Sequence, residues 1–78
     1  MNKEQINKQR DSFKKKHGEF PVFPVKVDYK YSGVAARGEI KPTSVGGILI
    51  FGYPGIIPLL DEHITDLKLI SDGEGRKF

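Results

Sequence analysis

The sequence of 78 residues contains neither cysteine nor tryptophan. Without cysteine, the chain has no disulfide bond and no thiolate metal site. Small domains often depend on such cross-links, so packing alone has to stabilise this one. A chain of this length holds a single hydrophobic core. The lack of cysteine is typical of a reducing compartment, and we therefore expect a cytoplasmic location.

Long apolar segments are missing as well. The longest covers residues 46–60, where four glycines and two prolines interrupt it. It is also shorter than the roughly 20 residues that a helix needs to span a bilayer. Residues 2–17 are polar and charged, whereas a signal peptide has an apolar segment after its basic start. We expect neither a signal peptide nor contact with a membrane.

The groups needed for catalysis are few. Of the two histidines, His17 ends a charged segment and should be a solvated cation. His63 stands near Asp61, Glu62 and Asp66, but a metal site needs three or four ligands at suitable spacing, and a polar turn is the simpler interpretation. The glycine-rich stretches lack the lysine and hydroxyl residue of a phosphate-binding loop, and no serine has a nucleophile motif around it. The sequence predicts no enzyme, no cofactor and no metal; a minor enzymatic or metal-binding role at His63 is the least favoured hypothesis.

Positive charge is present in excess, and it lies in one place. The formal net charge is +3, and residues 1–20 carry six basic against three acidic side chains. Residues 21–78 carry seven of each sign, so the excess belongs to the N-terminal segment alone. A charge asymmetry of this kind is typical of proteins that bind a polyanion.

The basic segment is expected to be helical. Residues 2–17 contain good helix formers without glycine or proline, and Gly18 follows where a helix commonly ends. Only Ile6 and Phe13, seven positions apart, form an apolar stripe. The spacing predicts a helix over residues 3–16 that packs through these two side chains and leaves its lysines in water.

A β-hairpin is expected over residues 25–41. Apolar and polar residues alternate from Val25 to Tyr31, and Ser32-Gly33 suits a two-residue turn. The register that this turn sets places large side chains opposite small ones on the inner face, and Asp28 opposite Arg37 with Lys26 opposite Glu39 on the outer face. The expected inner pairs are Tyr31 with Val34, Tyr29 with Ala36, Val27 with Gly38, and Val25 with Ile40.

The remaining residues favour short strands joined by turns. Ile48-Leu49-Ile50-Phe51 reads as a strand, Ile56-Ile57-Pro58 as its return, residues 61–64 as one helical turn, and residues 66–71 as a last strand. The fold class expected is α+β, mainly β: an N-terminal helix followed by a small antiparallel barrel of about five strands. The boundaries are residues 1–19 for the basic helix, 20–71 for the barrel and 72–78 for a flexible tail.

The last third of the chain resembles Src-homology-3-like barrels. In both, a strand ending in proline, here residues 55–58, leads through one short turn into a final strand, here residues 67–70. The resemblance covers about residues 52–70 and lacks the acidic loop and the tryptophan of that family. It implies an architecture, and it does not extend to the binding of proline-rich peptides.

Two functional hypotheses remain, besides a merely solvated charged helix. The first is a nucleic-acid-binding module whose helix contacts phosphates, with Tyr53 as an exposed ring for stacking. Its candidate residues are Lys8, Arg10, Lys14, Lys15, Lys16, Lys30 and Tyr53. The second is a protein-interaction or inhibitor module, such as a factor of a mobile element or phage. It would bind a larger protein, or a second copy as a homodimer, through the apolar hairpin of residues 48–60.

Overall fold

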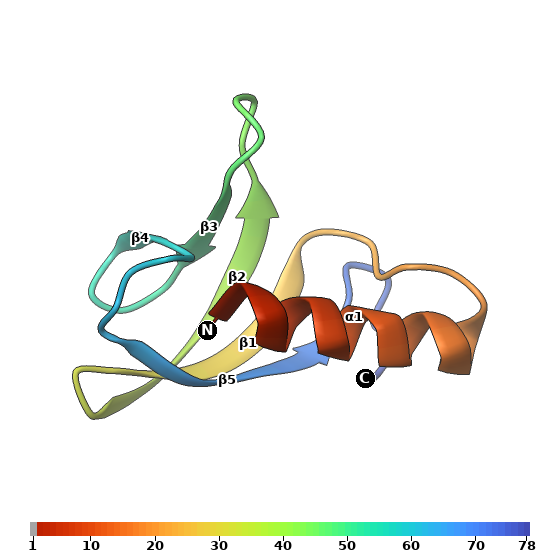
Figure 1. Cartoon of the computed structure of the whole chain (residues 1–78), viewed down its shortest axis with the longest axis horizontal. Helices are drawn as coiled ribbons and strands as arrows, with labels where there is room; N and C mark the ends of the chain where they lie inside the picture. Colours follow the sequence, from red (N-terminus) through yellow and green to blue (C-terminus); the bar gives the residue numbers. More distant parts are fainter. Residues whose placement is uncertain (1) are drawn as a thin grey trace.

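The computed structural model describes residues 2–78 as one helix and five antiparallel strands (Figure 1). The order of the strands in the sheet is β4-β3-β2-β1-β5. The mainly β architecture behind an N-terminal helix is therefore confirmed. The elements are α1 (Asn2–His17), β1 (Val25–Tyr31), β2 (Val34–Pro42), β3 (Ile48–Phe51), β4 (Ile56–Pro58) and β5 (Ile64–Ser71).

Helix α1 lies along β5, at the open side of the curved sheet (Figure 1). It ends before Gly18, whose φ of 85° and hydrogen bond to the Lys14 carbonyl (2.7 Å) are typical of a helix C-terminus. Ile6 and Phe13 are buried, as the sequence predicts. The helix thus adds its narrow apolar stripe to the core while its lysines stay in water.

The hairpin of β1 and β2 has the predicted register at every pair, including Asp28 with Arg37 and Lys26 with Glu39. Ser32 and Gly33 have φ values of 48° and 84°, the left-handed conformation that a type I′ turn requires. On the outer face, Arg37 Nε donates to Asp28 Oδ1 at 2.7 Å. The inner face contributes Val25, Val27, Tyr29 and Ile40 to a core that strands β3, β4 and β5 complete.

The five strands do not close into the predicted small barrel, because β4 and β5 do not pair and the sheet stays open. Two local features explain it. Strand β4 is three residues long and ends at Pro58, which has no N–H to donate. The outer edge of β5 is already bonded to Gln9 of α1 and to residues 77 and 78. Helix α1 packs along β5, and its first residue, Asn2, donates to the Leu59 carbonyl just after β4.

Residues 59–63 form two successive turns where the sequence predicts a helical turn, and β5 begins at Ile64, two positions earlier than expected. The turns form because Asp61 N–H donates to the Pro58 carbonyl, and Asp61 itself accepts from His63 N–H (2.9 Å). No helix within residues 2–78 combines the length and the apolar character that crossing a bilayer requires.

Candidate nucleic-acid interface

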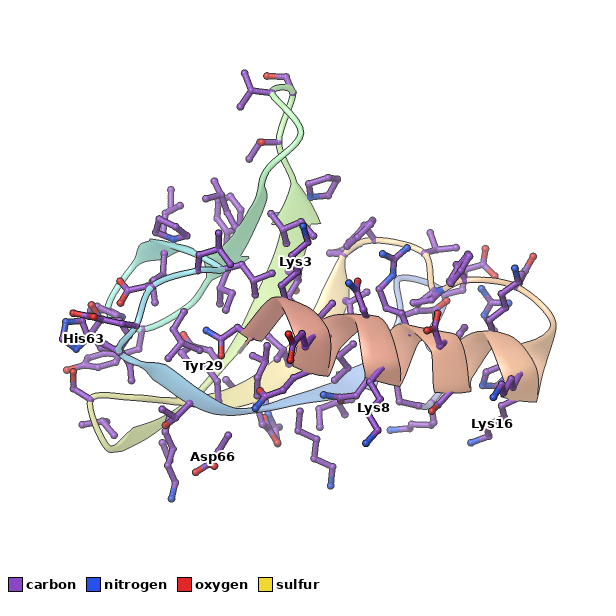
Figure 2. All side chains as sticks on the ribbon, viewed as in Figure 1. Lys3, Lys8, Lys16, Tyr29, His63 and Asp66 are labelled. Atoms are coloured by element: carbon purple, nitrogen blue, oxygen red, sulfur yellow. The ribbon has the colours of Figure 1, made fainter. Side chains whose placement is uncertain are left out.

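The basic side chains of α1 lie on two sides of the helix. Lys3, Arg10 and Lys14 follow each other at spacings of seven and four, and so share one side. Lys8 and Lys16, eight positions apart, share the other, and Figure 2 shows both pointing away from the side of Lys3. The candidate residues of the helix therefore form two separate cationic surfaces.

The first surface is partly occupied by the chain's own aromatic ring. The Arg10 guanidinium lies 5.0 Å from the centroid of the Phe20 ring, and Lys14 Nζ lies 4.6 Å from it. Arg10 is half-buried, and its Nε is buried without a hydrogen-bond partner within residues 2–78. Such cation–π contacts stabilise by about 0.5–1 kcal/mol each and leave the charge in place. Arg10 and Lys14 therefore pack on Phe20 and still leave positive charge on this side of the helix.

The second surface surrounds a hollow of about 360 Å³ between α1, β5 and residue 78. We call it the lysine-rimmed hollow. Lys68 of β5 adds a third ammonium group to those of Lys8 and Lys16, and no acidic side chain lines the hollow. Its floor is apolar and aromatic. The residues that line it are Lys8, Gln9, Ser12, Phe13, Lys16, Lys68, Leu69 and Phe78.

Lys68 is the functional candidate that the sequence interpretation missed. It lies in the last strand, where it alternates with the buried Leu67 and Leu69 and therefore points outward. That alternation was visible in the sequence. Its proximity to Lys8 and Lys16 was not, because most of the chain separates the last strand from the helix. Only the packing of α1 on β5 brings the three together.

A pair of hydrogen bonds holds the rim in place. Gln9 Nε2 donates to the Leu67 carbonyl (3.0 Å), and the Leu69 N–H donates to Gln9 Oε1 (2.7 Å). The side-chain amide thus bonds to the edge of β5 as a neighbouring strand would. Because Gln9 follows Lys8 directly, and Lys68 lies between the two bonded residues of β5, these bonds fix the backbone positions from which the two lysine side chains extend.

The floor of the hollow is held by aromatic contacts. The Phe13 ring lies 4.7 Å from the Phe78 ring and 4.3 Å from the His17 ring, centroid to centroid. His17 Nε2 bonds to the Lys77 carbonyl at 2.8 Å. His17 is half-buried, and this contact corrects the expectation of a fully solvated cation. The imidazole joins the end of α1 to the C-terminal segment.

A buried carboxylate fixes that C-terminal segment, which the sequence predicts to be flexible. Asp72 accepts hydrogen bonds from the backbone N–H groups of Val22 (3.1 Å), Glu74 (3.0 Å) and Arg76 (2.9 Å), and from the Arg76 guanidinium. Burial raises the pKa of this carboxyl, but the hydrogen bonds outweigh it and lower the pKa to about 2. Arg76 also bonds to Glu19, so residues 72–78 are held against the connector after α1.

The other two candidates lie elsewhere. Lys30 Nζ is 3.4 Å from Asp66 Oδ2 on the exposed face of the sheet. Tyr53 is 53% exposed and packs edge-on against Tyr31, whose ring lies 5.6 Å from that of His63. In Figure 2, His63 lies at one end of the molecule and Lys16 at the other. Tyr53 therefore belongs to the same end of the molecule as His63, away from Lys16.

Tyr53 is nevertheless held by the core. The buried Tyr29 hydroxyl donates to the Tyr53 carbonyl at 2.7 Å. Burial raises the pKa of the Tyr29 hydroxyl, which therefore keeps the proton that it donates. Gly52 leaves room for the hydroxyl, because a Cβ there would lie 2.5 Å from it. The hydrogen bond from the buried Tyr29 hydroxyl thus fixes the backbone of the turn that carries Tyr53.

The surroundings of His63 are those of an exposed turn. Its Nε2 lies 4.0 Å from Glu62 Oε1, and its backbone N–H is bonded to Asp61. Within residues 2–78, no three histidine or acidic side chains come together as metal ligands. Asp61, Glu62 and His63 therefore form a polar turn, which the hydrogen bond from the His63 N–H to Asp61 stabilises.

Compared with models of protein families, with curated proteins and with solved structures, the chain matches none, so its function has to be inferred from its own geometry and charge.

Proposed function

We propose that this protein is a non-catalytic module that binds nucleic acid through phosphate contacts, with the lysine-rimmed hollow at the centre of the interface. One observation carries the proposal. Three ammonium groups from two elements, those of Lys8, Lys16 and Lys68, surround one hollow, and none of them makes a salt bridge within residues 2–78. Lys68 also lies opposite Asp28 and helps to lower the pKa of that carboxyl, but without a salt bridge. Cations grouped around one hollow favour a ligand with several negative charges, such as a phosphate backbone.

The chemistry of the rim suits sequence-independent contacts. Lysine ammonium groups act as compact point charges and do not read base edges in a fixed geometry. Lys14 and Lys15 extend the positive field along the exposed part of α1, and Arg10 contributes its charge beside Phe20. The affinity is therefore expected to come from the release of counterions and to fall steeply with salt.

The test compares two triple variants of equal charge. Lys8→Ala, Lys16→Ala and Lys68→Ala together remove up to three phosphate contacts, and each duplex phosphate contributes about 0.9 to the slope of log affinity against log salt. We expect this variant to lose about two to three units of that slope by the same estimate. The control carries Lys26→Ala, Arg37→Ala and Lys41→Ala, which lie on strands β1 and β2 outside the candidate set, and should keep most of it.

Binding is measured with generic single- and double-stranded DNA and RNA at several salt concentrations. An equal loss of slope in both variants would mean that total charge, and not the hollow, determines binding. Binding that the hollow variant leaves unchanged would move the interface towards Lys30 and Tyr53. No detectable binding at about 50 mM salt, where phosphate contacts are strong, would reject the proposal.

The alternative function, a protein-interaction or inhibitor module, would then take first place. It is favoured by the apolar hairpin, on which Ile56 is 65% and Leu60 70% exposed. Under either function we propose a protein that needs no cofactor and acts in the cytoplasm, which agrees with the lack of cysteine. We also keep the Src-homology-3-like architecture of residues 52–70 as a proposal, supported by the turn that joins β4 to β5.

A further inference from the structure

The two edges of the sheet differ. The outer edge of β5 is covered by Gln9 and by the Phe78 N–H, which donates to the Ile70 carbonyl at 3.1 Å. Strand β4 pairs with β3 on one side, and no strand within residues 2–78 pairs with its other side. An uncovered strand edge is a template for pairing with another chain. One edge of this domain is thus closed. The other is uncovered but short, because Pro58 has no N–H and its carbonyl already accepts from the Asp61 N–H, so apolar side chains and not backbone bonds have to supply most of any contact there.

The open edge adjoins an apolar surface, which we define as Val45, Leu49, Ile56, Pro58 and Leu60. Val45 is 91% exposed, and Leu60 is 70% exposed. Between them lies a hollow of about 520 Å³, lined mostly by apolar side chains of β3, of β4, of the turn before β3 and of the turn after β4. Single exposed apolar residues are ordinary, whereas a cluster beside a hollow marks an interaction site.

Charges of opposite sign flank the apolar surface at Leu60. Lys3 of α1 lines the same hollow as Leu60. A second hollow, of about 560 Å³, shares Leu60 and is lined by the acidic residues Asp61, Glu62 and Asp66. Asn2 holds this arrangement together, because its side-chain amide donates to the Leu59 carbonyl at 2.9 Å. A cation and a group of anions therefore lie on opposite sides of one exposed leucine.

This arrangement complements itself. In a dimer with two-fold symmetry, each residue pair across the interface occurs twice, with the roles of the two chains exchanged. An axis near Leu60 brings Lys3 of one copy towards the acidic side chains of the other, and the same contact is repeated on the opposite side. Complementary charges of this kind select the partner and its orientation.

We propose that two copies of this chain associate through the apolar surface, with β4 beside β4 and Leu60 near the two-fold axis. A head-to-tail arrangement of β4 on β5 is disfavoured, because Gln9 and the C-terminal segment occupy the edge of β5. The exposed surface of one chain is 5027 Å². A standard interface of about 800 Å² per partner would cover roughly a sixth of it, an area that the surface around a short strand only just supplies. The dimer is therefore concentration-dependent.

The mass of the full chain in solution tests the proposal, measured by sedimentation velocity between about 5 and 500 μM, a range over which mass action reveals a weak dimer. Leu60→Asp should abolish the dimer without unfolding the domain, because this side chain is already mostly in water. The control is Val34→Asp, which changes a half-exposed valine at the β1–β2 turn and should leave the dimer intact.

A charge exchange makes the test specific to the orientation. Lys3→Glu and Glu62→Lys should each weaken the dimer by about tenfold or less, as expected for charge pairs at the rim of an interface. The two changes combined restore opposite charges across the axis and should recover the dimer. A chain that stays monomeric over the whole range overturns the proposal and leaves the apolar surface to a larger protein. A dimer that survives Leu60→Asp, or a double exchange without recovery, overturns it as well.

Discussion

The hydrogen bond from the Tyr29 hydroxyl to the Tyr53 carbonyl, which we call the Tyr29 anchor, allows us to predict the free-energy cost of a substitution at Gly52. A methyl group on residue 52 would lie 2.5 Å from the Tyr29 hydroxyl, and 3.1 Å from both the Arg37 carbonyl oxygen and Gly38 Cα. The first distance is too short for any contact, so Gly52→Ala has to displace the hydroxyl and break its bond to the Tyr53 carbonyl. We expect a cost of about 1–3 kcal/mol from the crowding. A domain of 78 residues has a total stability of about 4–12 kcal/mol.

Tyr29→Phe separates the two causes. Removing the hydroxyl deletes one hydrogen bond, at a cost of about 0.5–1.5 kcal/mol. It also removes the atom that the new methyl group would meet, so Gly52→Ala should cost about 1 kcal/mol less in the Tyr29→Phe background than in the wild type. The remaining backbone contacts at 3.1 Å keep the substitution from becoming neutral.

Urea unfolding of the four proteins, followed by far-ultraviolet circular dichroism, gives these energies. Tyr31→Phe is the matched control, because the Tyr31 hydroxyl makes only a long contact of 3.4 Å with Asp61. Its effect should be small, and it should not alter the cost of Gly52→Ala. If Gly52→Ala lowers the free energy of unfolding equally with and without the Tyr29 hydroxyl, the idea that this hydroxyl fixes the turn is wrong.

Three further predictions follow from the packing and the charges. Phe13→Ala, at a side chain that is 1% exposed, should lower the free energy of unfolding by about 3–5 kcal/mol, measured by urea unfolding. Because the pKa of Asp72 falls from 3.8 to about 2 on folding, the stability that this carboxylate contributes is present above about pH 4 and lost as the pH falls towards 2; unfolding of Asp72→Asn should depend less on pH over that window. Arg37→Ala removes an exposed pair with Asp28 and should cost less than about 1 kcal/mol, so a larger loss in urea unfolding would contradict the surface character of this contact.

The hairpin and the helix could be predicted because their patterns are local. In β1 and β2, the pairing of large with small residues and of Asp28 with Arg37 demands the same register, and Ser32-Gly33 permits the turn that sets it. In α1, two apolar residues seven positions apart define one face, and both Ile6 and Phe13 are buried on it. Each conclusion needs only residues that are close in the sequence.

The open sheet and the hydrogen bonds of the C-terminal segment could not be predicted, because each depends on a contact between distant residues. A glutamine on a helix gives no sign that it will bond to a strand as Gln9 does. Asp72 stands among glycines and charged residues, a composition typical of loops, and only its bonds to Val22 and Arg76 hold the segment. The lysine-rimmed hollow was missed for the same reason, since Lys68 joins the helix lysines only in the folded chain.

The bonds between α1 and the end of the chain also determine when the domain can close during its synthesis. Gln9 bonds to residues 58 and 60 positions later, and His17 bonds to the Lys77 carbonyl, 60 positions away. While the ribosome is still producing β2 and β3, Ile6 and Phe13 have no strand to pack against. Helix α1 is made before the strands, but its packing partner β5 exists only once residues 64–71 are available and pair with β1, so we expect the helix to dock late in folding.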